Sequence, residues 1–281
     1  GDYDPQADPP EAFLDPPQVI RLCREMERVR KQPEIPASNA GDKGAGRLAT
    51  EEESKAQHPV RLVRTAVATT QAVEPFGWMV AAEAMKRGFY RAKRRAVVGD
   101  GGNWIGPLGD MHFPGWVQIL DFMHLLVHLY AAAMAAHRGE GKKAWGCYRR
   151  WLCWAWGGQV DKVIEGLKAQ SQRLGGPPAK ATDEDPRRIM LLTLEYVKAN
   201  AARMDYASYR RAGLPITSAP VESLIKQFNQ RVKGTEKFWL SGGAEAILQS
   251  RAAYLSEDGR AERFHEHRPR GQAVGKNRLR V

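Results

Sequence analysis

The sequence predicts an α/β fold with parallel strands that is interrupted by a long helical segment. Two short apolar stretches, 94–100 and 117–122, are typical of strands, and each ends in or next to an aspartate. A helical pattern over 75–91 precedes the first strand, and an unusually aromatic helical stretch over 124–174 follows the second. Strands that alternate with helices at this spacing usually pair in parallel.

The first 57 residues are predicted to contain one helix between two polar segments. Residues 1–17 are acidic and rich in proline, which favours an extended surface segment. Apolar side chains recur at helical spacing over 18–31. Residues 32–57 have almost no apolar content and are predicted to be a disordered linker. The segment 60–69 is rich in β-branched residues and is predicted to be a strand.

The second half of the chain is predicted to be helical. An amphipathic helix covers 186–203, a further helix starts near Pro220, and another covers 241–254. Thr217 or Ser218 could cap the helix at Pro220, because both carry a hydroxyl before its first turn. Four apolar residues of that helix are expected to face a core: Val221, Leu224, Ile225 and Phe228. The tail after 263 is basic and predicted to be flexible.

Composition favours a polyanionic partner. The 281 residues carry a formal charge of +11, which points to nucleic acid before an anionic membrane surface. No apolar run is long enough for a transmembrane helix, and the acidic start is unlike a signal peptide. The three cysteines form no paired CxxC motif, so neither a disulfide framework nor a zinc knuckle is indicated. A reducing cytoplasm fits this composition.

Acidic residues at the strand ends are the first candidate site. Asp100 and Asp121 end the two predicted strands, and open α/β sheets place their sites at the carboxyl ends of strands. Both residues also have a purely structural interpretation. Asp100 could open a turn with the two glycines that follow it, and Asp121 could cap the next helix.

Glu222 is the third candidate acid. It lies near the start of its helix and is followed only by bases, namely Lys226, Arg231 and Lys233. Carboxylate oxygens suit Mg²⁺, and two such ions about 4 Å apart support phosphoryl transfer between nucleic acids. The bases would then contact the phosphate backbone. The alternative is a glutamate that is favoured at a helix start by the macrodipole.

Two further groups each allow two interpretations. Aromatic residues of 124–174, among them Trp151, alternate with bases such as Arg149 and Arg150, so they could stack on nucleotides or form the core of a helical subdomain. His124 and His128 could bind zinc together with Asp121, or His124 could support the acids while His128 packs inside the subdomain.

The sequence resembles the DDE-class transposases of bacterial insertion sequences, in the Mutator-related branch called Kra-type. The resemblance covers residues 58–262 roughly. The stretches that carry it are Arg61–Thr65, Gly99–Gly101, Ile119–His124, Met204–Tyr206 and Gly213–Gly259, with the Asp-x-x-His and Pro-Val-Glu-Ser motifs as its most specific parts.

The resemblance implies an RNase H-like core with a helical insertion. The core would comprise 58–124 and 213–262, the insertion 125–212, with an N-terminal segment at 1–57 and a basic tail at 263–281. Asp100 and Glu222 would be catalytic metal ligands for two Mg²⁺ or Mn²⁺ ions, with Asp121 and His124 beside them. DNA contacts are expected from seven residues: Lys226, Arg231, Lys233, Lys237, Arg149, Arg150 and Trp151.

The implied reaction is metal-dependent cleavage at insertion-sequence ends, followed by strand transfer. The partners would be the element's ends, target DNA and further copies of the chain in a bacterial cytoplasm, where the protein would be nucleoid-associated when bound to DNA. The family's first catalytic aspartate, in an Asp-Gly context on an opening strand, has no counterpart here. We therefore expect a fragment or a decayed copy. A non-catalytic DNA-binding protein and an RNase H-like nuclease are the alternatives.

Overall fold

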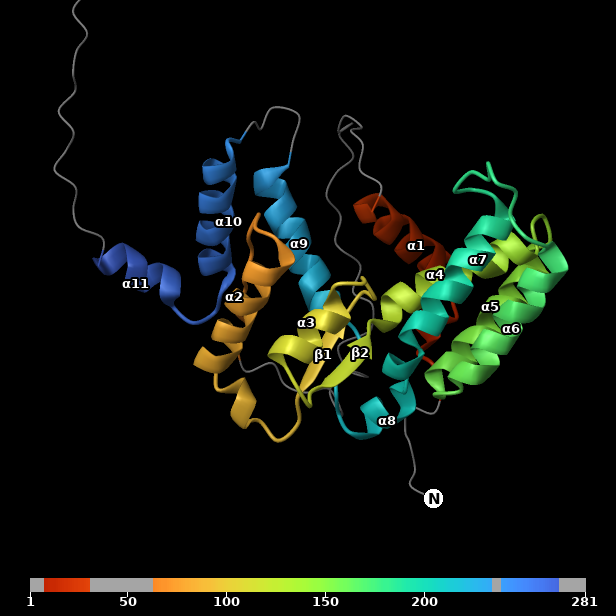
Figure 1. Ribbon diagram of the computed structural model, residues 1–281, viewed down its shortest axis with the longest axis horizontal. Coiled ribbons are helices and arrows are strands. Elements are labelled where there is room, and N and C mark those ends of the chain that lie inside the picture. Colours follow the sequence, from red (N-terminus) through yellow and green to blue (C-terminus); the bar gives the residue numbers. More distant parts are fainter. Residues whose placement is uncertain (1–7, 31–62, 234–238, 268–281) are drawn as a thin grey trace, which may run out of the picture. The chain divides into compact units, whose positions relative to one another are not determined.

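The computed structural model describes residues 8–30, 63–233 and 239–267 (Figure 1). The predicted linker 32–57, Lys237 and the tail beyond 267 lie outside these residues. The chain groups into two compact units, one made of 1–60 with 84–222 and the other of 61–83 with 223–281. The domain boundaries at 57, 124, 212 and 262 stay predictions.

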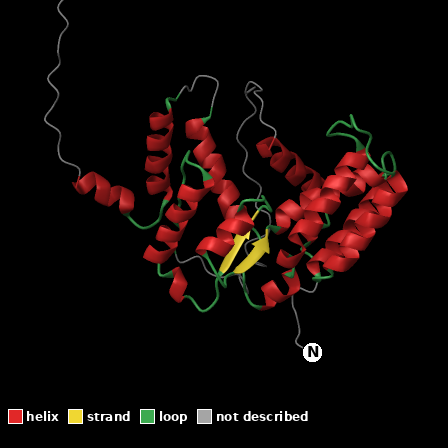
Figure 2. Ribbon diagram, in the orientation of Figure 1, coloured by secondary structure: helices red, strands yellow, loops and turns green. Residues whose placement is uncertain are grey.

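A two-stranded parallel sheet lies in the first unit. Strand β1 (Ala96–Gly99) pairs with β2 (Val117–Leu120), and Ala96 is opposite Val117 while Gly99 is opposite Leu120. Helix α3 (Ile105–His112) connects them. The predicted combination of helices with parallel strands is therefore confirmed, although the strands are short. Within the described ranges, all other regular structure is helical (Figure 2).

Helix α4 (Phe122–Ala136) is the centre of the first unit. It follows β2 directly, and its inward side chains, such as Leu125, Leu126 and Leu129, are completely buried. Four helices pack around α4: α1 (Pro16–Arg30), α5 (Gly141–Trp156), α6 (Val160–Leu174) and α7 (Pro186–Asn200). The short helix α8 (Tyr206–Arg211) contacts α5. The predicted helices 18–31 and 186–203 correspond to α1 and to α7 with the 3-10 turn after it, and the predicted helical stretch 124–174 is divided into α4, α5 and α6.

The aromatic side chains of α5 belong to this core. Tyr148 and Trp156 are buried, and Trp151 is only 2% exposed. The rings of Phe122 and Trp156 meet edge to face with centroids 5.1 Å apart. Of the two interpretations of the aromatic stretch, the structure supports the helical core for these residues. A DNA-stacking role for Trp151 is therefore wrong for this structure, because its ring has no exposed face.

The second unit contains α2 (Val73–Lys86), α9 (Ala219–Val232), α10 (Ser241–Leu255) and α11 (Arg260–His267), the first two of which also include residues of the first unit. Helix α2 covers most of the helical pattern predicted over 75–91, and a turn of 3-10 helix, η2 (Phe89–Arg91), covers its end. Helix α11 includes the start of the segment predicted to be a flexible tail.

The strand predicted over 60–69 is not formed by its described part, 63–69. This extended segment bonds to α10 and the turn after it instead of to another strand. The Arg64 carbonyl accepts from the Glu257 N–H at 2.8 Å, and the Ala66 N–H donates to the Ser256 hydroxyl at 3.1 Å. The Gln249 amide donates to the Ala68 carbonyl. One backbone N–H and two side chains thus satisfy backbone groups that a neighbouring strand would otherwise satisfy.

Helix α9 starts where the sequence predicts, but its apolar side differs. Leu224 is buried in a small cluster with Ala66, Ala252 and Leu255. Val221 is 50% exposed, so the expectation that it faces a core is wrong. It lies in the first turn of the helix, one turn before the residues that pack into this cluster.

Candidate site at the carboxyl ends of the strands

Asp121 lies at the junction of β2 and α4 and is 1% exposed. Its Oδ1 accepts from the backbone N–H groups of Met123 at 2.6 Å and His124 at 3.1 Å, which caps α4. Its Oδ2 accepts from the Ser218 N–H at 2.5 Å and from the Ser218 hydroxyl. Both carboxylate oxygens are therefore occupied, and the predicted capping role is confirmed.

The surroundings of Asp121 favour its charged form. Burial raises the pKa of this carboxyl group, but His124 and the hydroxyl and N–H of Ser218 together outweigh burial, so the net pKa is below the ordinary value. A charged carboxylate with four donors is a structural anchor. It connects the first turn of α4 to the start of α9, 97 residues later in the chain.

Ser218 fixes the start of α9, and Glu222 follows one turn later. The Ser218 carbonyl accepts from the Val221 and Glu222 N–H groups, while its hydroxyl donates to Asp121 rather than capping the helix. Thr217 Oγ1 accepts from the Ala219 N–H at 3.1 Å. The sequence indicated either residue as the cap, but not the link between Ser218 and Asp121, because that link joins distant segments.

His124 lies between two of the predicted acids. Its Nδ1 is 3.5 Å from Asp121 Oδ1, and its Nε2 is 3.8 Å from Glu222 Oε1. The imidazole is buried, whereas the Glu222 side chain is 29% exposed. The structure thus brings together three of the four predicted catalytic residues: Asp121, His124 and Glu222.

Asp100 follows β1 and opens a tight turn. Its Oδ1 accepts from the Gly102 N–H at 3.0 Å, which confirms the predicted turn. The Tyr196 hydroxyl of α7 donates to the Asp100 carbonyl at 2.8 Å. Gly101 has a φ of +83°, and a Cβ there would be 2.7 Å from the Tyr196 ring. The backbone around Asp100 is therefore held by α7, but no contact between the Asp100 carboxylate and Glu222 is observed within the described residues.

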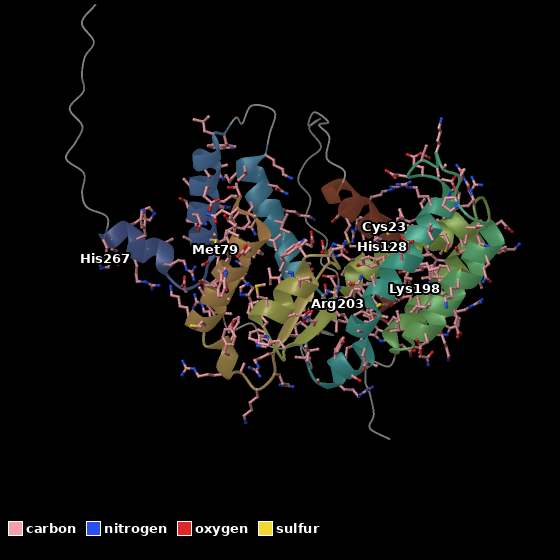
Figure 3. All side chains as sticks on the ribbon, viewed as in Figure 1. Cys23, Met79, His128, Lys198, Arg203 and His267 are labelled. Carbon is pink, nitrogen blue, oxygen red and sulfur yellow. The ribbon has the colours of Figure 1, made fainter. Side chains whose placement is uncertain are left out.

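The zinc interpretation is not supported. The His128 ring stacks on Tyr196 with centroids 4.0 Å apart, on the side of α4 that faces α7 (Figure 3). Among the residues with a described position, no group of three His, Cys, Asp or Glu side chains could hold a metal ion. His128 thus packs inside the first unit, as the alternative predicted.

The predicted DNA-contacting bases are exposed where they are described. Lys226, Arg231 and Lys233 lie on or just after α9, and Arg149 and Arg150 on α5. A denser basic cluster, 86–95, was not among the predicted contacts, because it lies in a connection between elements and forms no recognisable motif. The sequence feature that could have indicated this cluster is the high local density of bases between α2 and β1.

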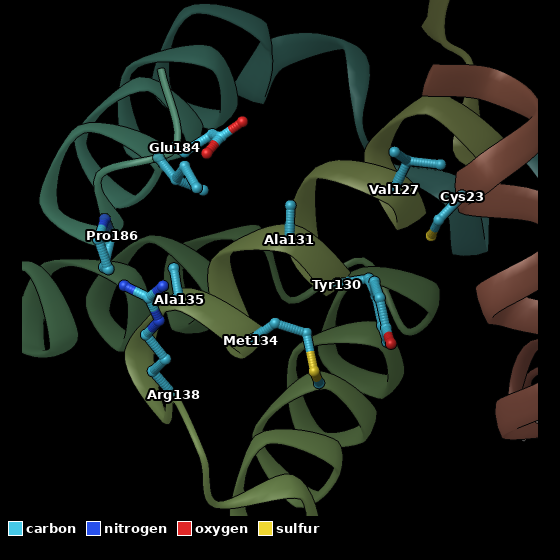
Figure 4. Close-up of a pocket in the computed structure, with 10 residues that line it drawn as sticks. Cys23, Val127, Tyr130, Ala131, Met134, Ala135, Arg138, Glu184 and Pro186 are labelled. Carbon is cyan, nitrogen blue, oxygen red and sulfur yellow. The ribbon is translucent and has the colours of Figure 1, made fainter. Parts of the chain in front are cut away.

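The first unit also contains a cavity of about 360 Å³ between α1, α4 and α7 (Figure 4). Its lining includes Cys23, Tyr130, Met134 and Ile189 and none of the predicted acids.

Comparison with models of known families, with characterised proteins and with solved structures gives no match to this chain. In the described ranges, no helix has the length and apolar character needed to cross a bilayer.

Proposed function

We propose that this chain is a DDE-type DNA transposase with an RNase H-like core. The observation that carries this proposal is the junction of β2, α4 and α9. There a buried Asp121 anchors the start of α9 while His124 lies within 3.8 Å of Glu222. An acid on a helix far along the sequence is thus positioned beside the carboxyl ends of parallel strands, where α/β proteins place their sites.

The four residues divide into two roles. Asp121 and His124 position the junction, because the oxygens of Asp121 are occupied and the His124 ring is buried. Asp100 and Glu222 remain the ligands that we propose for Mg²⁺ or Mn²⁺. Mg²⁺ often binds one or two carboxylates and completes its shell with water and substrate phosphates. Because the family's first aspartate has no counterpart here, we expect these two carboxylates to hold the ions more weakly than a complete set of three would. When bound, they would activate water and stabilise the leaving oxygen.

The partner in this proposal is DNA, both the ends of a mobile element and its target. The charge of +11 supports a polyanionic partner. Lys226, Arg231 and Lys233 continue along the chain from Glu222 and are exposed. In this proposal they contact the phosphate backbone of the bound DNA. Further copies of the chain on the same DNA belong to the proposal too.

The test is cleavage of a plasmid that carries the chain's own coding sequence with its natural flanks, in Mg²⁺ or Mn²⁺. We expect Glu222→Gln to abolish cleavage and to leave DNA affinity within about twofold, because the substitution removes a ligand but no positive charge. Glu195→Gln, an exposed glutamate on α7, is the matched control and should cut like the parent. Equal cutting by Glu222→Gln and the parent would refute the site.

A second candidate, DNA binding without catalysis, has one observation in its favour. The described residues provide no group of three metal-binding side chains. This candidate expects that neither the parent nor Glu222→Gln cuts DNA in any metal ion, while both bind it with the same salt dependence. The plasmid assay and a binding titration therefore separate the two functions.

A further inference from the structure

The connection between α2 and β1 is the most basic part of the described chain. Residues 86–95 contain six bases and no acid, and 84–99 contain no acid either. We call the six bases the amino-end patch: Lys86, Arg87, Arg91, Lys93, Arg94 and Arg95. Arg94 and Arg95 come immediately before β1 and so lie at the amino end of the strands, opposite to Asp100 and Asp121. The other four bases come from the end of α2 and the turn that leads from α2 to β1 (Figure 1).

Backbone carbonyls hold the last two arginines of the patch in place. Arg94 Nη1 donates to the Ala212 carbonyl at 2.6 Å, and Arg95 Nη1 donates to the Tyr90 carbonyl at 3.1 Å. The Arg95 guanidinium also lies 5.8 Å from the centre of the Trp116 ring. The bond from Arg94 brings the patch beside the end of α8, where Arg211 adds another exposed base. Basic side chains from two distant segments thus meet on the first unit.

The charge of the patch is not neutralised by the protein around it. None of the ion pairs between described residues involves Lys86, Arg91, Lys93 or Arg94, and all four side chains are exposed. Like charges this close repel one another. Arg94 and Arg95 are bound by neutral carbonyls, which orient a guanidinium and leave its full charge available.

We infer that the amino-end patch binds the phosphate backbone of DNA, at a surface separate from Glu222. Arginine predominates in the patch, and its planar guanidinium makes paired hydrogen bonds to phosphate oxygens. Phe89, between these bases, is 44% exposed and could stack on an unpaired base. The choice of DNA as the polyanion rests on the proposed function, whereas the position of the patch does not.

The decisive experiment is a salt titration of binding to a random-sequence 30-base-pair duplex. The patch variant is Lys86→Glu with Arg91→Glu and Lys93→Glu, because these three exposed side chains have no partner in the described structure. We expect the slope of log K against log [salt] to become shallower by about 3, since each lost phosphate contact removes about 0.9. At 0.15 M salt this corresponds to an affinity roughly 100-fold lower.

The matched control is Lys168→Glu with Lys180→Glu and Lys198→Glu, three exposed lysines of the same unit that lie on α6, on the loop after it and on α7. It changes the net charge of the protein by the same amount. Circular dichroism should show both variants folded. A slope that changes equally in the two variants would overturn the inference, because general charge and not the patch would then explain binding.

Two further outcomes distinguish this inference from the proposed function. If the slope of log K against log [salt] becomes shallower in the patch variant as expected but the parent never cuts the plasmid, the patch is established and the catalytic proposal fails. If the parent binds vesicles containing phosphatidylserine through the patch and does not bind the duplex, the inference about DNA is overturned and a membrane surface takes its place.

Discussion

The two ends of the short parallel sheet differ in how their side chains are satisfied. At the carboxyl end, Asp121 is buried and each of its oxygens has two donors, while the carbonyl of Asp100 accepts from Tyr196. At the amino end, the bases of 86–95 are mostly exposed, and carbonyl groups are the acceptors observed for Arg94 and Arg95. The carboxyl end is held by specific hydrogen bonds, whereas the amino end carries a concentration of exposed positive charge.

This difference decides how each end should respond to substitution. A buried group that loses its partner leaves unsatisfied donors behind, which costs stability. An exposed base that is removed costs little stability but changes the electrostatic field and the response to salt. Substitutions at the carboxyl end should therefore lower the free energy of unfolding, whereas substitutions at the amino end should mainly change DNA affinity and its dependence on salt.

The largest effect is expected for Asp121→Ala. The substitution leaves the Ser218 hydroxyl and three N–H groups without their acceptor, so we expect a loss of about 3 kcal/mol in the free energy of unfolding. Asp205→Ala removes an exposed cap of α8 and should cost about 1 kcal/mol. Urea unfolding of both variants measures the difference. Equal losses would mean that Asp121 is an ordinary cap.

Acid unfolding tests the charge of Asp121 separately. Its pKa in the folded protein is below the ordinary value of 3.8, so its stabilising contribution is fully present above that value and is lost as the pH falls through the lowered pKa. Asp121→Asn should therefore flatten the stability profile below pH 3.8 relative to the parent. An unchanged acid limb would contradict the charged anchor.

Gly101→Ala should have a smaller effect, about 2 kcal/mol. The φ of +83° is unfavourable for alanine, and the new Cβ would be 2.7 Å from the Tyr196 ring. Gly115→Ala is the matched control, because Gly115 has a φ of +77° but no atom within 4 Å of the place that a Cβ would take. Thermal unfolding of both variants separates backbone strain from the clash. If the two variants lose the same stability, Tyr196 does not restrict the turn after β1.

Tyr196→Phe should cost about 1 kcal/mol, since it removes one hydrogen bond to the Asp100 carbonyl. The ring and its stacking on His128 would remain. Tyr209→Phe is a control at a partly buried tyrosine of α8. Urea unfolding should rank Tyr196→Phe as the more damaging of the two. The reverse order would show that α7 does not hold the carboxyl end of β1.

The local part of the carboxyl end could be predicted from the sequence. Asp121 before an apolar helix and Asp100 before two glycines have recognisable local patterns, and both the cap and the turn are observed. The link from Asp121 to Ser218 could not be predicted, because nothing in either segment indicates its partner. Local hydrogen-bonding patterns can be read from a sequence, whereas a bond between residues 97 positions apart depends on how the helices pack.

The same limit explains two errors. Residues 63–69 have the β-branched content of a strand, but their backbone bonds to Ser256, Glu257 and Gln249. Trp151 follows two arginines in the sequence, yet its side of α5 faces the core. Propensity indicates which residues tolerate an extended or helical backbone, and only tertiary contacts decide what that backbone bonds to.

The smallest effect on stability is expected at the amino end, for Arg91→Ala. This side chain is exposed, so the free energy of unfolding should change by less than about 0.5 kcal/mol. The same substitution should weaken DNA binding at low salt, because one phosphate contact is lost. Urea unfolding and the duplex titration on one preparation give both quantities. If Arg91→Ala unfolds more easily and binds DNA as the parent does, the contrast between the two ends is wrong, because Arg91 would then stabilise the fold and not contribute to DNA binding.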